Sequence, residues 1–241
     1  MNIRLKRYKK DFEHSYTFGV FPTIELLKQQ PKQVAQVLIH TKGERNQGVQ
    51  KLRLLCDQLG IPSEVNDKAI DRLAPRENAY AVGVFYKYNP QLDSAGNHVV
   101  LVNPSSMGNL GTILRTMVGF GFHDLGIIKP AADIFDPRVI RASMGAIFRS
   151  RFETFDSFGT YLQDYPRKVY TLMTDGDTPL PEARFGGPYC LVFGSESSGL
   201  DDSFRGLGTC ISIRQSDAID SFNLAISVGI TLYQAKQAHE G

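Results

Sequence analysis

The sequence predicts an α/β protein in two parts, and three observations carry this prediction. Short apolar segments of strand length alternate along the chain with longer segments of helical periodicity. From residue 98 onward the strand-like segments are almost continuously apolar, which is typical of parallel strands covered on both faces. A segment rich in Pro, Gly, Asn, Asp and Ser at 89–97 precedes these strands and is predicted to be a linker.

The first part combines three helical segments with two strands. Thr23 is a capping residue followed by good helix formers, so a short helix is expected to start there, after a proline. A second helix, at 48–62, has an apolar face that includes Leu59, and it is expected to end at Gly60. The remaining elements are a strand at 33–40, a helix at 64–74 and a strand at 81–88.

The second part is predicted to be a parallel sheet flanked by helices. Its last helix is expected to be capped by Ser221. In such sheets a ligand binds beyond the carboxyl ends of the strands. The expected strands lie at 98–104, 124–130, 168–176, 189–196 and 209–215, and the expected helices at 110–122 and 221–237.

The chain has 241 residues, of which 42% are hydrophobic and 22% are charged. This composition excludes collagenous, low-complexity and wholly disordered proteins. The charge is unevenly distributed: residues 1–98 carry 15 Lys or Arg and 10 Asp or Glu, a net charge of +5, whereas residues 99–241 carry 12 and 15, a net charge of −3. A basic first part indicates an anionic partner, of which nucleic acid is the commonest large one.

Cellular location is addressed by three features of the sequence. No segment reaches the roughly 18 consecutive apolar residues of a membrane helix, and the start MNIRLKRYKKDF is too polar for a secretory signal peptide. Cys56, Cys190 and Cys210 lie far apart without CxxC spacing, so three buried reduced thiols are expected rather than disulfides or a zinc site. A cytoplasmic protein without a membrane partner is therefore predicted.

Three segments that follow predicted strands in the second part are candidates for chemistry. The first, NPSSMGNLGTILRTMVGFGF at 103–122, is a glycine-rich turn leading into a helix. Asn109 stands beside the helix start, and Arg115 follows on its first turns. Taken alone, such a turn with a surface arginine is more often structural. It is not a Walker A loop, because no Gly-Lys-Ser/Thr follows.

The second segment, LVFGSESSGL at 191–200, breaks a buried strand at glycines around Glu196. The third, ISIRQSDAIDSFNLAISVGI at 211–230, follows a strand with a polar loop and then a helix. Asn223 is less expected at this helix start than Ser221, because asparagine is a poor helix former. Taken alone, each of these segments also fits an ordinary turn or cap.

Together, in order and spacing, the three segments resemble motifs 1, 2 and 3 of the SpoU/TrmH-like RNA methyltransferases of the SPOUT superfamily. The resemblance covers residues 99–238, and RASMGAIFRSRF at 141–152 is similar to the family's Ala-Ser-x-Gly-Ala segment. The matched motif positions are Asn109, Gly111 and Arg115, then Gly194, Glu196 and Gly199, then Ser221, Phe222 and Asn223.

The first part resembles the substrate-binding extension of the same family, a small ribosomal-protein-like α/β domain, chiefly at 61–85. Together with the basic charge, this resemblance implies an RNA-binding domain at 1–92 that folds separately and supplies most of the RNA affinity. A methyltransferase domain is expected at 95–241.

The third motif departs from the family pattern in its loop. Ile213 is followed by Arg214 and Gln215, where the family usually has Pro-Met, and Asp217 stands where it usually has glycine. Both departures fall in the loop that is expected to wrap the adenine of the cofactor. They do not determine the shape of that loop. Hydrogen bonds from its backbone atoms to the cofactor need not change.

The resemblance implies both a fold and a cofactor. The fold is an α/β sheet whose C-terminal segment threads through a loop as a trefoil knot, an exception to the rule against knots. The cofactor is S-adenosylmethionine, held bent in the knot, and no metal is required. The residues implied to line it are Met173, Thr174, Phe193, Gly194, Gly199, Ile213 and Phe222.

The reaction implied is methyl transfer to a ribose 2′-hydroxyl of RNA, with ribosomal RNA favoured over transfer RNA by the extra N-terminal domain. The family assigns activation of that hydroxyl to its motif 1 arginine, Arg115 here. Arg115 could act as the base, but free arginine is a poor base at neutral pH. The second role is to orient the phosphate and the hydroxyl, and both roles remain open. The family's homodimers imply that Arg115 reaches the partner chain's cofactor. Hydrogen bonds that fix the arginine and the ribose are expected from Asn109, Glu196, Ser221 and Asn223.

Three alternatives remain at this stage. Other SPOUT branches methylate a base, although Arg115 with Ser221 and Asn223 favours the ribose. A ribosome-assembly protein that binds RNA without catalysis would account for the altered third motif. A nicotinamide-binding fold is disfavoured, because no G-x-G-x-x-G follows a strand.

Overall fold

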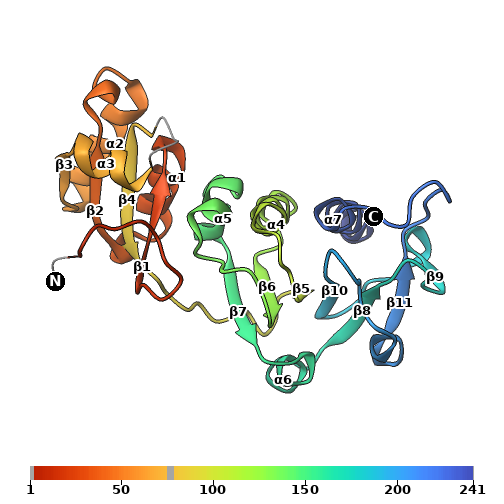
Figure 1. Cartoon of the computed structure of the whole chain (residues 1–241). Coiled ribbons are helices and arrows are strands. Elements are labelled where there is room, and N and C mark those ends of the chain that lie inside the picture. Colours follow the sequence, from red (N-terminus) through yellow and green to blue (C-terminus); the bar gives the residue numbers. More distant parts are fainter. Residues whose placement is uncertain (1–2, 75–78, 241) are drawn as a thin grey trace. The chain divides into compact units, whose positions relative to one another are not determined.

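The protein folds into two compact units, each built on its own β-sheet (Figure 1). The structure, a computed structural model, describes residues 3–74 and 79–240, with side chains up to residue 237. The first unit comprises Met1–Tyr88 and Asp133–Arg149, and the second comprises Asn89–Ala132 and Ser150–Gly241.

The first unit contains a four-stranded sheet with the order β1-β4-β2-β3. Strand β4 pairs antiparallel with β1 and with β2, whereas β2 and β3 run parallel. The strands that the sequence predicts at 33–40 and 81–88 are β2 and β4. The bounds are β1 (His14–Phe18), β2 (Val34–Ile39), β3 (Ser63–Val65) and β4 (Ala81–Tyr86).

Helices cover both faces of this sheet. On one face α1 and α2 bury Leu27 and Val49, and on the other face α3 buries Ile70 against Val84. The bounds are α1 (Val20–Gln29), α2 (Gln47–Leu59), α3 (Asp67–Leu73) and α5 (Pro137–Ala142), with short 3-10 turns at Pro31–Gln33, Thr41–Gly43 and Ala146–Arg149.

Helix α1 begins earlier than the sequence predicts. It starts at Val20, and Pro22 lies in its first turn, where a helix needs no N–H donor. The preceding Gly19, at φ 105°, is the N-cap residue without a side-chain cap. The Thr23 hydroxyl, expected to cap the helix, instead donates to the Gly19 carbonyl at 2.7 Å from inside the helix.

Helix α2 ends as predicted, with Gly60 in the left-handed region at φ 67°. Its buried face contains Val49, Leu52 and Cys56. The prediction that Leu59 belongs to this face is wrong, since its side chain is 41% exposed. At about 100° per residue Leu59 lies at the edge of the apolar stripe, in the last turn of the helix.

The two units differ from the expected domains, 1–92 and 95–241, in the segment 133–149. This segment packs on the first unit. Arg149 pairs with the buried carboxylate of Glu25 at 2.7 Å. Gly145, at φ 80°, approaches α1 so closely that an added Cβ would lie 2.8 Å from Cβ of Glu25. A side chain at this position would therefore push the segment off the helix.

The second unit contains a seven-stranded sheet with the order β7-β6-β5-β10-β8-β11-β9, and every neighbouring pair is parallel. This confirms the parallel sheet that the apolar strands predict. The bounds are β5 (His98–Val102), β6 (Asp124–Ile128), β7 (Arg151–Phe155), β8 (Lys168–Leu172), β9 (Thr178–Pro179), β10 (Tyr189–Phe193) and β11 (Thr209–Ser212).

Figure 1 shows α4 and α7 on one side of the parallel sheet and α6 on the other. On the α6 side, Phe158 and Phe204 pack with Val169 and Val192 of the sheet. The parallel strands are thus covered on both faces, as their composition requires. The bounds are α4 (Met107–Gly119), α6 (Phe158–Asp164) and α7 (Leu224–Glu240), with 3-10 turns at Leu180–Glu182 and Asp202–Leu207.

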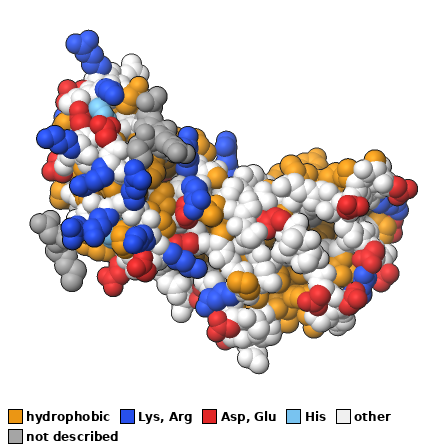
Figure 2. Space-filling view, viewed as in Figure 1, with side chains coloured by type: hydrophobic (Ala, Val, Ile, Leu, Met, Phe, Trp, Pro, Cys, Tyr) orange, Lys and Arg blue, Asp and Glu red, His pale blue; other side chains and the backbone are white. Residues whose placement is uncertain are grey.

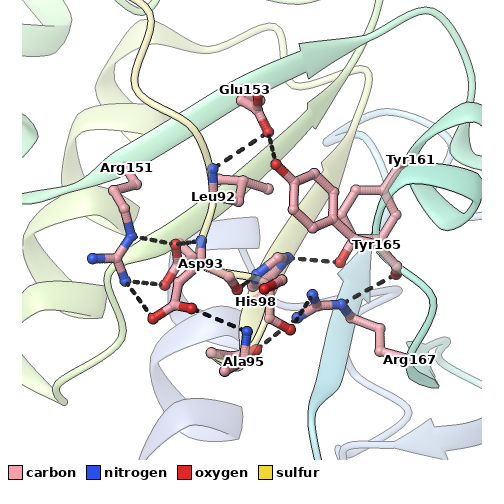
Figure 3. A network of polar contacts seen from close by, with 12 residues as sticks. Leu92, Asp93, Ala95, His98, Arg151, Glu153, Tyr161, Tyr165 and Arg167 are labelled. Carbon is pink, nitrogen blue, oxygen red and sulfur yellow. Dashed lines mark hydrogen bonds and ion pairs between the residues drawn. The ribbon is translucent and has the colours of Figure 1, made fainter.

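The segment 89–97, predicted to be a linker, directly follows the boundary between the two units after Tyr88, but its backbone is bound by the second unit. The backbone N–H of Asp93 donates to Asp124 at 2.8 Å, and Arg167 donates to the carbonyl oxygen of Gly96 at 2.6 Å (Figure 3). These bonds fix the segment to the amino ends of the parallel strands. Turn-rich composition identified a loop correctly, but it does not report which side chains bind that loop.

A buried histidine lies at the centre of this network. His98 is fully buried, with Nδ1 2.9 Å from the Tyr161 hydroxyl and Nε2 2.8 Å from the Asp93 carbonyl oxygen (Figure 3). Burial lowers the pKa of His98 to about 4, against the opposing effect of the Asp93 carbonyl. The imidazole is therefore neutral at physiological pH.

Cys56, Cys190 and Cys210 are buried free thiols, as expected. Within residues 3–74 and 79–240, none of the helices combines the length and the apolar character needed to cross a membrane.

Candidate functional site

A cavity of about 370 Å³ opens at the carboxyl ends of β8, β10 and β11, the edge of the sheet where the sequence predicts ligand binding. All seven residues expected to line a cofactor contribute to its wall. They are Met173, Thr174, Phe193, Gly194, Gly199, Ile213 and Phe222.

The second motif forms a tight turn in this wall. Gly194 approaches Gly199 so closely that a Cβ on Gly194 would lie 1.9 Å from the carbonyl carbon of Gly199. Gly199 itself has φ 66°, a conformation that favours glycine. Both glycines of the motif are thus required by the backbone.

Glu196 in this turn accepts hydrogen bonds from the loop before α4. Its Oε2 accepts from the backbone N–H and the hydroxyl of Ser105, both at 3.1 Å, and its Oε1 accepts from the backbone N–H of Ser106 at 3.1 Å. Oε1 also accepts from Nδ2 of Asn109 at 3.1 Å. One carboxylate therefore binds two successive residues of the loop that precedes α4 and an asparagine in the first turn of the helix.

These bonds decide the charge of Glu196. Burial raises the pKa of its carboxyl, but hydrogen bonds from Ser105, its own backbone, Asn109 and Ser106 outweigh burial and hold the pKa below its ordinary value. Glu196 is therefore an anion that accepts hydrogen bonds and is not a general acid at neutral pH.

The third motif joins the same group of side chains through Asn223. Its Nδ2 donates to Oδ1 of Asn109 at 3.2 Å. Its Oδ1 accepts from the backbone N–H of Ala225 at 2.9 Å, so Asn223 occupies the N-cap position of α7, which starts at Leu224. The prediction that Ser221 caps this helix is wrong, and the capping role explains an asparagine at the helix start.

Ser221 lies before the helix and lines the cavity. Of the five expected catalytic residues, Glu196 and Ser221 line the cavity, and Asn109 and Asn223 are hydrogen-bonded beside it. Arg115 is exposed in the middle of α4, is not in the cavity wall, and has no hydrogen bond or ion pair within the described part of the chain.

Sequence reasoning missed an ion-pair group in the cavity wall. Nε of Arg205 donates to Asp202 at 2.9 Å, and its Nη2 donates to Asp175. The Arg205 hydrogen bond lowers the pKa of the Asp175 carboxyl. The sequence signal that could have identified this ion-pair group is the position of Asp175, directly after the predicted lining pair Met173-Thr174.

The altered loop of the third motif is closed by its own unusual residues. Nε2 of Gln215 donates to the carbonyl oxygens of Asp220 at 2.8 Å and Ile219 at 3.3 Å. Arg214 pairs with Glu182 at 3.4 Å between exposed side chains. The side-chain amide thus closes a loop in which the family usually has Pro-Met and a glycine.

Comparison with known proteins finds relatives among RNA methyltransferases. The chain is 31% identical over 143 residues to a protein of Synechocystis named as an uncharacterized tRNA/rRNA methyltransferase, covering 58% of this chain and 52% of that protein. It is 30% identical over 146 residues to the 23S rRNA (uridine(2479)-2′-O)-methyltransferase of Streptomyces viridochromogenes, covering 57% of this chain and 51% of the relative. The matched regions thus span about half the length of these curated relatives.

A solved structure has the same fold over almost the whole chain. The SpoU methyltransferase AviRb from Streptomyces viridochromogenes, in complex with the cofactor AdoMet, matches with a TM-score of 0.82 at 22% identity, covering 95% of this chain and 92% of that chain. The model of the SpoU rRNA Methylase family matches residues 96–233, which is more than half of the sequence. This protein therefore belongs to the SpoU rRNA Methylase family.

Proposed function

We propose that this protein transfers a methyl group from S-adenosylmethionine to a ribose 2′-hydroxyl of ribosomal RNA. The observation that carries the proposal is the hydrogen-bonded set Glu196, Asn109 and Asn223, which joins the three motifs at the rim of one cavity. The name of the Streptomyces relative, a 23S rRNA 2′-O-methyltransferase, supports both the ribose and the ribosomal RNA.

The cavity suits S-adenosylmethionine in size and in chemistry. Its volume of about 370 Å³ lies within the range of small-ligand sites. Met173, Phe193, Ile213 and Phe222 offer apolar surface for an adenine ring, and Gly194 and Gly199 contribute the glycine turn to the same wall. Once bound, the cofactor supplies an electrophilic methyl group on its sulfonium.

The side chains around the cavity have roles that follow from their bonds. Glu196 remains anionic and holds the Ser105–Ser106 loop and Asn109 in place. Asn223 donates a hydrogen bond to Asn109 and accepts one from Ala225, so it joins Asn109 to the start of α7. Ser221 lines the cavity, and its hydroxyl is proposed to bind the ribose.

Arg115 is proposed to hold the RNA phosphate and the 2′-hydroxyl in line with the methyl group. Its planar guanidinium donates two parallel hydrogen bonds, which suits a phosphate, and it is a poor base at neutral pH. Because Arg115 lies away from the cavity of its own chain, the proposal assigns it to the cavity of a partner copy.

A homodimer would supply that partner. Helix α7 exposes Ile226, Ile230 and Tyr233, with 54%, 37% and 55% of each residue accessible, on one face. Arg115 precedes Thr116 on α4, which contacts Gly229 of α7, so Arg115 lies beside the α4–α7 contact. A second copy packed against this face would bury the apolar stripe and approach Arg115.

Further features of the family are proposed for this chain. The threaded trefoil knot is proposed from the likeness of this fold to the solved SpoU methyltransferase structure. The basic first unit is proposed to bind the RNA, with domain boundaries near 1–92 and 95–241 apart from the segment 133–149. Since the proposed substrate is cytoplasmic, we place the protein in the cytoplasm, with no metal and no membrane partner.

The proposal is tested with the purified chain, radiolabelled S-adenosylmethionine and total ribosomal RNA from cells that lack the gene. Label should enter the RNA, and nuclease digestion should release it as a 2′-O-methylated nucleoside. Label on a base would replace the ribose assignment with base methylation. Binding of RNA without binding of S-adenosylmethionine by calorimetry would favour a non-catalytic RNA-binding protein.

A further inference from the structure

The first unit presents a strongly basic segment at its N-terminus, residues 3–10, which is called the basic arm here. Within these eight residues the sequence has no acidic residue. All five of its cationic side chains are exposed, and Figure 2 shows Lys and Arg side chains gathered over the first unit. They are Arg4, Lys6, Arg7, Lys9 and Lys10.

The arm is fixed to the unit by its alternating apolar residues. Ile3 and Leu5 pack against the apolar cluster on the α3 face of the sheet, while Arg4 and Lys6 remain exposed. The hydroxyl of the buried Tyr16 accepts from the backbone N–H of Lys6 at 3.3 Å and donates to the Lys6 carbonyl at 2.8 Å. One tyrosine therefore holds the middle of the arm through its backbone without binding any of its charged side chains.

Two more contacts fix the second half of the arm. Nζ of Lys87 donates to the Lys10 carbonyl at 2.8 Å, and Nε of Arg7 donates to the Arg72 carbonyl at 3.3 Å. Both Lys87 and Arg72 are themselves cationic. Burial lowers the pKa of Lys87 against the opposing effect of Asp133, and the charge of Lys10 adds to the lowering.

The charges of the arm are not neutralised by the protein. Within residues 3–74 and 79–240, none of its five cations has an ion-pair partner. The nearby Asp133 is already engaged by the Tyr8 hydroxyl and by Lys87. An ordered segment with unpaired cations matches a polyanion, because counterion release rewards each phosphate that it neutralises and little ordering entropy is lost on binding.

We propose that the basic arm is the strip of the first unit that binds the phosphate backbone of the RNA. The inference rests on the proposed function for the identity of the polyanion, and it locates the RNA contact within a unit that carries basic residues on several surfaces. Phosphate contacts supply affinity and position without reading bases, so the arm contributes affinity while sequence recognition lies elsewhere.

The test neutralises three arm residues in the full chain, Arg4→Gln, Lys6→Gln and Lys9→Gln together. The control makes the same charge change elsewhere in the unit, at Lys28, Lys32 and Lys51, which are exposed and have no ion pair in the described structure. Affinity for a fluorescent stem-loop RNA of ribosomal sequence is measured across salt concentrations. The slope of log affinity against log salt should become shallower by about 2 to 3 in the arm variant, at 0.7 to 0.9 per phosphate, and should change much less in the control.

A second variant tests whether the arm must be held in place. Tyr16→Phe removes the hydroxyl that binds Lys6 and changes no charge. RNA affinity should fall severalfold, and trypsin should cleave after Lys6 or Arg7 faster than in the wild type. Equal losses in the arm and control variants, or an unchanged slope in the arm variant, would overturn the proposal.

Separate measurements distinguish a failure of the proposed function from a failure of the proposed role of the arm. S-adenosylmethionine binding, measured by calorimetry, should be the same in all three variants because the cavity belongs to the second unit. A wild-type chain that binds RNA through the arm but transfers no methyl group would refute the function alone. A wild type that methylates RNA, with an arm variant of unchanged KM for RNA, would refute the arm alone.

Discussion

The side-chain amide of Asn109 donates a hydrogen bond to the Glu196 carboxylate over 3.1 Å, although the two residues stand 87 positions apart in the sequence. The first belongs to the glycine-rich turn that opens α4 and the second to the turn after β10. Their contact joins two motifs that, taken separately, resemble ordinary turns. Glu196 also accepts hydrogen bonds from Ser105 and Ser106, so one carboxylate binds both the loop before α4 and the helix itself.

Glu196→Gln should lower both stability and cofactor affinity. The substituted amide has one acceptor oxygen, so either the Ser105 or the Ser106 N–H loses its partner or faces an NH₂ group. The expected cost is about 1–3 kcal/mol, or a fall in Tm of several degrees, with weaker S-adenosylmethionine binding. Calorimetry measures both quantities, and the exposed Glu13→Gln is the control. Unchanged cofactor affinity would remove Glu196 from the organisation of the site.

Arg115→Lys and Arg115→Ala should both fold, dimerise and bind S-adenosylmethionine nearly normally, because this side chain makes no bond within the described residues. Methyl transfer should fall by about a hundredfold or more, about 2.7 kcal/mol, since lysine lacks the planar fork that holds phosphate and hydroxyl together. Single-turnover rates on ribosomal RNA measure this effect, with Arg184→Lys, at an exposed position of the second unit outside the cavity wall, as the control. A lysine variant within about threefold of the wild type would exclude Arg115 from the mechanism.

Ile226→Glu with Ile230→Glu should convert a dimer into a monomer. Two buried and unpaired carboxylates would oppose packing of a second copy on the apolar stripe of α7. Light scattering should give twice the chain mass of 26.8 kDa for the wild type and 26.8 kDa for the variant. Gln163→Glu, at an exposed position of α6 away from this stripe, should remain dimeric. A wild type that is monomeric at micromolar concentration would contradict the dimer and the role of Arg115 in a partner's cavity.

Acid should destabilise the protein through His98. Its folded pKa, about 4, lies below the unfolded value of 6.5, so between these pH values the unfolded chain binds the proton and the folded chain does not. Stability is therefore full above pH 6.5 and falls as the pH drops toward 4, by up to about 3 kcal/mol. His98→Gln should reduce this pH dependence in urea unfolding, whereas His123→Gln, another histidine of the same unit, should retain it. Equal pH dependence in the wild type and His98→Gln would show that other groups cause the acid sensitivity.

Much of the fold follows from local sequence. The continuous apolar strands predict a parallel sheet covered on both faces, and the structure confirms it. The parallel order in turn places a cavity at the carboxyl ends of β8 and β10, where all the expected lining residues meet. Gly60 ends α2 as predicted, because a left-handed residue after a helix is a local requirement that glycine satisfies.

The errors arise where a partner from a distant part of the chain decides the outcome. Local propensity favoured Ser221 as the cap of α7, whereas Asn223 occupies that position and bonds Asn109 at the same time. The segment 89–97 has the composition of a linker, yet Asp124 and Arg167 bind its backbone. No local pattern contains this information, because each of these contacts joins segments far apart in the sequence.

The sequence by itself determined the α/β class, the parallel sheet and the three motifs, because hydrophobic periodicity and glycine-rich turns are local properties. The tertiary structure alone decided that the segment 133–149 packs with the first unit, that Glu196 binds the loop before α4, and that Arg205 joins Asp175 and Asp202 in the cavity wall. The physical reason is that burial and hydrogen-bond partners depend on which distant segments meet when the chain folds, and only the folded chain brings them together.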